Sequence, residues 1–96
     1  MSFPAGEQFF IDSVRRGLEA LEPRSRQAFE QEARGFIGQE ATHRRVHALF
    51  NAQLARHGLV NDWEPRAAAR LELLEGADPR HWLAITAANE HFTAIL

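Results

Sequence analysis

The sequence contains no cysteine, which excludes disulfide bonds, thiolate nucleophiles and zinc sites built from cysteine. Any bound metal ion must therefore take oxygen and nitrogen ligands. Lysine is absent as well, so all 11 basic residues are arginines, and they are scattered among acidic residues at a formal net charge of −2. This scattered distribution argues against a nucleic-acid partner.

Long apolar runs are also missing, and no segment approaches the length of a membrane span. The N-terminus lacks the basic and then apolar layout of a signal peptide. We therefore expect a soluble cytoplasmic protein without a membrane partner. A length of 96 residues allows one small domain, 1–96, whose modest core would gain stability from a metal ion or a second chain.

Apolar residues recur at intervals of three and four, which indicates amphipathic α-helices rather than strands. Proline and glycine breaks divide this pattern into about four helices, over 2–21, 23–57, 62–75 and 78–96. The expected punctuation comes from Pro4, Pro23, Gly58, Gly76 and Pro79, with Asp62 and Asp78 as N-terminal caps. The sequence thus predicts an all-α antiparallel bundle with 23–57 as its long central helix.

The predicted helix over 23–57 carries ionisable side chains on the face that should be buried. Its apolar stripe consists of Phe29, Ala33, Phe36, Phe50 and Leu54. At about 100° of rotation per residue, Glu40, His43 and His47 fall within roughly 60° of arc in the middle of this stripe. A buried charge needs a partner, and a metal ion is one such partner.

Two other predicted helices interrupt their apolar faces in the same way. Glu7 lies between Phe3 and Phe10 on a stripe that continues through Val14, Leu18 and Leu21. Glu90 is the sole ionisable residue on the face that it shares with Leu83, Thr86, Ala87, Thr93 and Ala94. For Glu7 the alternative is a first-turn carboxylate that the helix dipole favours and that points to water. The helix over 62–75 has only apolar residues on its stripe, Trp63, Ala67, Leu71 and Leu74, so we assign it a packing role.

The remaining histidines are weaker candidates. His91 lies about 100° around the helix from Glu90 and is expected to flank the site rather than bind beside it. His57 and His81 stand near helix ends, where capping or solvent contact is expected. Asp78-x-x-His81 is a weak ligand spacing.

Glu40-x-x-His43 places a carboxylate and an imidazole one helical turn apart, so both can reach an ion held between helices. The dinuclear carboxylate site of helical bundles uses one Glu from each of two helices and a Glu-x-x-His from each of two more. Glu7, Glu90 and one Glu-x-x-His are present here, and the second Glu-x-x-His is not. The alternative is a metal-free polar network in which the inward Glu and His residues pair with one another. A Ser-His-Asp arrangement is not favoured, because no serine stands on a strand-to-helix turn.

Three ordered motifs cover nearly the whole chain: Phe3-Pro-Ala-Gly-Glu7-Gln-Phe-Phe10, then Phe36-Ile-Gly-Gln-Glu40-Ala-Thr-His43-Arg-Arg-Val-His47 with Phe50-Asn51, then Thr86-Ala-Ala-Asn-Glu90-His91-Phe92-Thr93-Ala94. With these motifs the chain resembles the bacterial family of predicted metal-dependent hydrolases, which is related to ferritin-like helical proteins. The resemblance implies a ferritin-like bundle in which Glu7, Glu40, His43 and Glu90 bind metal, with His47 as a further ligand or a supporting group. Members of that family continue past the equivalent of Leu96 into another helix rich in Glu and His, so the resemblance implies an N-terminal portion or a shortened form of a longer bundle.

We therefore expect a metal-dependent hydrolase whose divalent ion is iron or manganese in preference to zinc, acting on a small molecule that the sequence does not identify. A carboxylate such as Glu40, or His47, would take the proton from a metal-activated water. One alternative is a ferritin-like non-haem di-iron oxidase or oxygenase. Another is a non-catalytic helical dimerisation module, and a homodimer is compatible with all three hypotheses.

Overall fold

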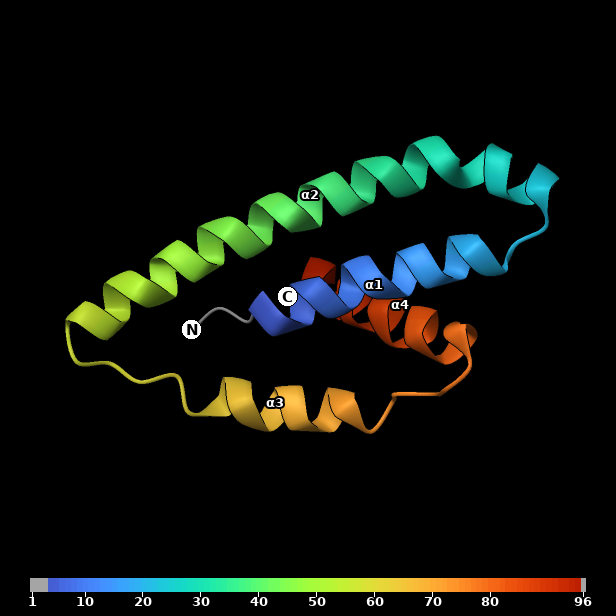
Figure 1. Cartoon of the computed structure of the whole chain (residues 1–96). Helices are drawn as coiled ribbons and strands as arrows, with labels where there is room; N and C mark the ends of the chain where they lie inside the picture. Colours follow the sequence, from blue (N-terminus) through green and yellow to red (C-terminus); the bar gives the residue numbers. More distant parts are fainter. Residues whose placement is uncertain (1–3, 96) are drawn as a thin grey trace.

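The computed structural model describes residues 4–95, which form four α-helices and no strand within that range. The helices are α1 (Pro4–Ala20), α2 (Pro23–Arg56), α3 (Trp63–Glu72) and α4 (Pro79–Ile95) (Figure 1). The expectation of an all-α protein with about four helices is confirmed. None of the described helices is long and apolar enough to cross a membrane.

Most helix ends follow the predicted signals. Gly58 (φ 79°) and Gly76 (φ 81°) adopt the left-handed conformation that glycine permits. Asp78 caps α4, because its Oδ1 accepts the backbone N–H of Arg80 at 2.9 Å. The capping prediction for α3 was wrong. Asp62 makes no side-chain cap hydrogen bond, and the preceding Asn61 accepts the backbone N–H of Glu64 at 3.3 Å instead.

Helix α1 lies at the centre of the fold, between α2 and α3 and against α4 (Figure 1). All close backbone contacts between helices of residues 4–95 involve α1. The prediction that 23–57 is the central helix was therefore wrong. With 34 residues, α2 is about 51 Å long and sets the 50 Å long dimension of the molecule, so its ends extend past its shorter neighbour. Phe29 and Phe50, near these ends, are 54% and 51% exposed.

The core forms where α1 meets α4. The apolar residues Phe9, Ile11 and Trp82 are buried, and the Phe9 ring stacks on Trp82 with centroids 4.8 Å apart. The indole N–H of Trp82 donates to the backbone oxygen of Leu74 at 3.0 Å, which ties α4 to the turn that precedes it. Phe9 and Ile11 are absent from the stripe predicted for this helix, because that stripe describes a helix with one buried face and α1 is covered on several sides.

The predicted stripe of α1 is less buried than expected. Phe10, Val14, Leu18 and Leu21 are only partly buried, and Phe3 lies outside the described residues. This stripe faces the space between α2 and α4, where hollows rather than packed side chains are found. The candidate site occupies one of these hollows.

Candidate metal centre

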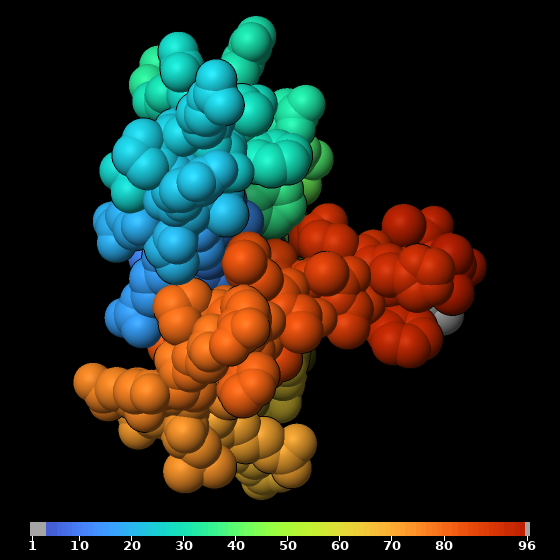
Figure 2. All heavy atoms as spheres, turned by 90° about the vertical axis from the view of Figure 1, so that its right-hand side faces the viewer, coloured from blue at the N-terminus to red at the C-terminus, as the bar shows by residue number. Residues whose placement is uncertain are grey.

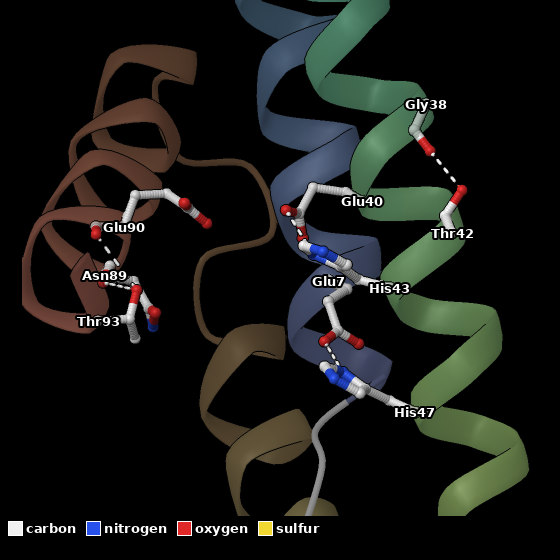
Figure 3. Close-up of polar contacts among 9 residues, drawn as sticks. All are labelled: Glu7, Gly38, Glu40, Thr42, His43, His47, Asn89, Glu90 and Thr93. Atoms are coloured by element: carbon white, nitrogen blue, oxygen red, sulfur yellow. Dashed lines mark hydrogen bonds and ion pairs between the residues drawn. The ribbon is translucent and has the colours of Figure 1, made fainter. Parts of the chain in front are cut away.

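One pocket of about 410 Å³ brings together residues from all four helices. All five predicted ligands line it: Glu7 from α1, Glu40, His43 and His47 from α2, and Glu90 from α4 (Figure 3). The rest of its lining is Phe10, Trp63, Asn89 and Thr93. Residues 83 positions apart in the sequence therefore share one hollow.

Glu40 is the most deeply buried ionisable group of the site, at 3% exposure. Its Oε1 lies 3.3 Å from Nδ1 of His43, one turn further along α2. Burial raises the pKa of Glu40 because it disfavours the charged carboxylate, and the nearby negative charge of Glu90 raises it further. The contact with His43 lowers this pKa but does not cancel the rise. The positive charge near Glu40 therefore does not offset its burial.

Glu7 is 8% exposed, so the alternative that its carboxylate points to water is wrong. Its Oε1 pairs with Nδ1 of His47, which joins α1 to α2 (Figure 3). Its Oε2 is buried and accepts no hydrogen bond from any residue within 4–95. A buried carboxylate oxygen without a partner is costly, and it is a natural position for a cation.

The two histidines lie side by side on α2. Their rings are stacked with centroids 6.0 Å apart, and their side chains are 46% (His43) and 40% (His47) exposed. Each directs Nδ1 at a different carboxylate, Glu40 and Glu7 respectively. The site is therefore organised as two Glu–His pairs, whose histidines lie in adjacent turns of α2.

Glu90 approaches the pocket from the opposite side. Its residue is exposed, and its side chain points across the pocket toward Glu40 (Figure 3). The two carboxylates are close enough for their charges to interact. The structure thus places Glu90 as a wall of the site that faces the two Glu–His pairs.

The donor types fit a divalent cation, because the pocket offers three carboxylates and two imidazoles, one carboxylate oxygen is buried without a partner, and the buried Glu40 has a raised pKa. In the observed rotamers, however, no three carboxylate or imidazole groups among residues 4–95 lie close enough together to share one ion. One oxygen each of Glu7 and Glu40 is paired with a histidine. Each Glu–His pair therefore lacks a third ligand from residues 4–95 within reach in these rotamers.

The weaker candidates lie elsewhere. Asp78 pairs with Arg80 at 2.8 Å, and this contact lowers the pKa of Asp78 to about 2. His81 is exposed, and neither it nor Asp78 lines the pocket, so this pair does not supply the second Glu-x-x-His. His91 is exposed and meets the ring of Phe92 edge-on at 5.7 Å, and His57 contacts Gln53 at the end of α2.

Sequence reasoning missed several residues of the pocket. Trp63 was assigned to packing, but it is 45% exposed and lines the site. Asn89 also lines it, beside Glu90, and its position next to a candidate ligand was the available signal. Nothing in the spacing of α3 points to Trp63, because its place depends on how the loop after α2 turns.

A comparison with known protein families shows to which family the chain belongs. The family model described as "Predicted metal-dependent hydrolase" matches residues 1–96. The chain belongs to the predicted metal-dependent hydrolase family. This confirms the resemblance stated from the three motifs, and the family description implies dependence on a metal ion without identifying it. No curated protein and no solved structure matches the chain.

Proposed function

We propose that this member of the predicted metal-dependent hydrolase family binds a divalent metal ion in the pocket between α1, α2 and α4 and uses it to hydrolyse a small molecule. Glu7, Glu40, His43 and Glu90 are the proposed ligands, with His47 as a further ligand or as the proton acceptor. The observation that carries the proposal is the pair of buried carboxylates: Glu40 at 3% exposure, and Glu7 with an unpartnered Oε2.

The pocket is lined by more acidic than basic side chains. Taking a carboxylate out of water costs several kcal/mol in real proteins unless a cation compensates it. Here two buried carboxylates and Glu90 face one hollow, and the two histidines are the only basic side chains in its lining. A divalent cation would neutralise this excess and use the free oxygen of Glu7.

A bound divalent ion would lower the pKa of a coordinated water toward neutrality and polarise a substrate oxygen. The chain's own residues have separate tasks. His47 keeps Nδ1 on Glu7, which leaves Nε2 to accept a proton from the attacking water. An oxygen of Glu40 that does not bind the ion is a second proton acceptor. Phe10 and Trp63 supply apolar walls that limit the access of bulk water.

The choice of metal follows from the donor atoms. A carboxylate-rich set with histidine suits iron or manganese, and zinc is also compatible with it. The same donor balance supports a second candidate, oxygen activation at a non-haem iron centre. Spectra of the iron-loaded protein with and without oxygen separate the two, because hydrolysis gives no oxygen-dependent change.

The test of hydrolysis uses protein loaded separately with iron, manganese and zinc and a panel of nitrophenyl esters and phosphates. We expect metal-dependent turnover that is lost in Glu40→Gln and kept in the matched control Glu30→Gln. Glu30 lies on the same helix but is exposed and pairs with Arg34 at 2.9 Å. Turnover that is unaffected by chelation, or equal in the two variants, would contradict a hydrolase centred on Glu40.

A third candidate, a non-catalytic dimerisation module, is supported by exposed apolar side chains. Val46, Leu49 and Phe50 are 49%, 61% and 51% exposed within little more than one turn of α2, directly beside His47. Clusters of this kind mark protein contacts more often than isolated apolar residues do. A second copy seated there would form a homodimer whose interface adjoins the metal pocket, so dimerisation is compatible with catalysis.

A further inference from the structure

Two hydroxyl groups meet in the interface between α1 and α4. Ser13 is 0% exposed and Thr86 is 5% exposed, and their side-chain oxygens lie 2.7 Å apart. The neighbouring core side chains, Phe9 and Trp82, are aromatic. A hydrogen bond in such surroundings restrains geometry strongly, because sliding or rotating either helix would leave a buried hydroxyl without a partner.

The direction of the hydrogen bond follows from proton counting. Ser13 donates its single hydroxyl proton to the backbone oxygen of Phe10 at 2.8 Å. Thr86 must then donate to Ser13 Oγ. The hydroxyl of Thr86 is therefore the group that ties α4 to α1, and Ser13 is its acceptor.

One turn further along α1, a tight side-chain contact brings α1 and α4 together. A Cβ atom on Gly17 would lie 2.5 Å from Cδ1 of Leu83, so the Leu83 side chain packs into the space that the glycine leaves open. The pairs Gly17–Leu83 and Ser13–Thr86 run in opposite directions along the two helices, as expected for antiparallel neighbours. Together they fix both the register and the rotation of α4.

Beyond Thr86, α4 has little other support. Residues 87–95 are all exposed, and the C-terminal part of α4 projects from the rest of the molecule (Figure 2). Glu90 follows Thr86 by four residues, which places it about one turn, or 6 Å, further along nearly the same face. Its position over the pocket is therefore set mainly by the anchor at Thr86.

We propose that Ser13 and Thr86 are positioning residues that hold Glu90 opposite Glu40 and Glu7, and that their hydrogen bond thereby tunes the affinity of the site for its metal ion. The second part rests on the proposed function, because it matters only if Glu90 is a ligand. Neither Ser13 nor Thr86 lines the pocket, so their effect must pass through the placement of α4.

The test compares two substitutions at one position. Thr86→Val keeps the shape and removes the hydroxyl, whereas Thr86→Ser keeps the hydroxyl and removes a methyl group. By titration calorimetry with Mn²⁺ alone, we expect Thr86→Val to bind about 10- to 100-fold more weakly than the wild type, as for other groups that orient metal ligands, and Thr86→Ser to bind nearly normally. If Thr86 has a purely structural role, Thr86→Ser should bind Mn²⁺ more weakly than Thr86→Val, or the two folded variants should bind it equally well.

The matched control is Thr42→Val. Thr42 is exposed on α2, and its hydroxyl bonds to the backbone oxygen of Gly38 in its own helix at 3.1 Å (Figure 3). We expect unchanged Mn²⁺ affinity. If Thr86→Val, verified as folded, bound Mn²⁺ as tightly as this control, the link between Thr86 and the metal site would be refuted.

A second measurement does not depend on metal binding. Because the chain has no native cysteine, spin labels at Arg45→Cys on α2 and Ala94→Cys on α4 report a single distance distribution. We expect this distribution to broaden in Thr86→Val and Ser13→Ala but not in Thr86→Ser. Equal widths in all variants would overturn the positioning role. If the two variants broaden this distribution while the wild type binds no Mn²⁺, the result would instead support the anchor and refute the metal site.

Discussion

Glu40 and Glu90 face each other across one pocket from two helices, α2 and α4, that make no close backbone contact within residues 4–95, and the charge of Glu90 raises the pKa of Glu40. Both helices reach this arrangement by packing on α1. The carboxylates thus oppose each other although no close backbone contact between α2 and α4 within residues 4–95 supports them. Their mutual repulsion is a cost that a cation between them would remove.

Glu40→Gln tests this cost in the metal-free protein. The raised pKa means that the folded state binds a proton at Glu40 more strongly than the unfolded state does, so the ionised form lowers stability as the pH rises above the ordinary pKa of 4.5. We expect Glu40→Gln to unfold at a higher temperature than the wild type at pH 7, with a difference that shrinks as the pH falls toward 4. Thermal unfolding of both proteins in the presence of a chelator, measured from pH 4 to pH 7, tests this expectation. A variant less stable than the wild type at pH 7 would show that Glu40 is adequately compensated without metal.

His43→Ala and His47→Ala should separate the roles of the two histidines. Loss of His43 is expected to weaken metal binding most, because His43 and Glu40 form the Glu-x-x-His unit. Loss of His47 is expected to lower turnover more than metal retention, and to cost about 1–3 kcal/mol of stability because the buried Glu7 carboxylate then lacks its partner. Metal content, turnover and unfolding are measured for each variant, with the exposed His91→Ala as control. Equal loss of metal in both variants would make His47 a ligand rather than a proton acceptor.

Gly17→Ala should disturb the site from a distance. The added Cβ would meet the side chain of Leu83 and force it out of its position against α1, at a cost of about 1–3 kcal/mol. Gly38→Ala is the matched control, since nothing lies within 4 Å of its Cβ position and alanine favours a helix by about 1 kcal/mol. In chemical denaturation, the free energy of unfolding should therefore fall in Gly17→Ala and rise in Gly38→Ala. Stabilisation by Gly17→Ala would mean that the α1–α4 approach is looser than the structure indicates.

The proposed homodimer is tested by sedimentation over a range of concentrations. If a second copy covers the patch formed by Val46, Leu49 and Phe50, Leu49→Glu should weaken association by tenfold or more, since a charge would be buried. Leu73→Glu serves as the comparison, because Leu73 is 84% exposed and lies outside the patch. A wild type that stays monomeric at every concentration would remove the support for the dimer.

The sequence predicted the helices and the polar residues of the pocket, because both depend on local spacing. Glu40, His43 and His47 interrupt an apolar stripe, and this interruption is visible without knowing any neighbour. What could not be predicted was the order of packing. The central place of α1 and the burial of Phe9 depend on how several helices surround one another, which a single-helix pattern does not encode.

The same limit explains the residues that were missed. Ser13 and Thr86 are ordinary residues until α1 and α4 are docked in one register, and Trp63 reaches the pocket only through the path of the loop before it. The corrected cap of α3 has a local cause, since Asn61 and Asp62 are both good capping residues and only the backbone path selects between them.

The most direct test of the central claim is the metal content of the protein by elemental analysis, after purification without chelator and after loading with iron, manganese and zinc. The proposed site predicts retention of a divalent ion in stoichiometric amount by the wild type and its loss in Glu40→Gln, with Glu30→Gln unchanged. A wild type that retains none of the three metals after loading would contradict the metal centre.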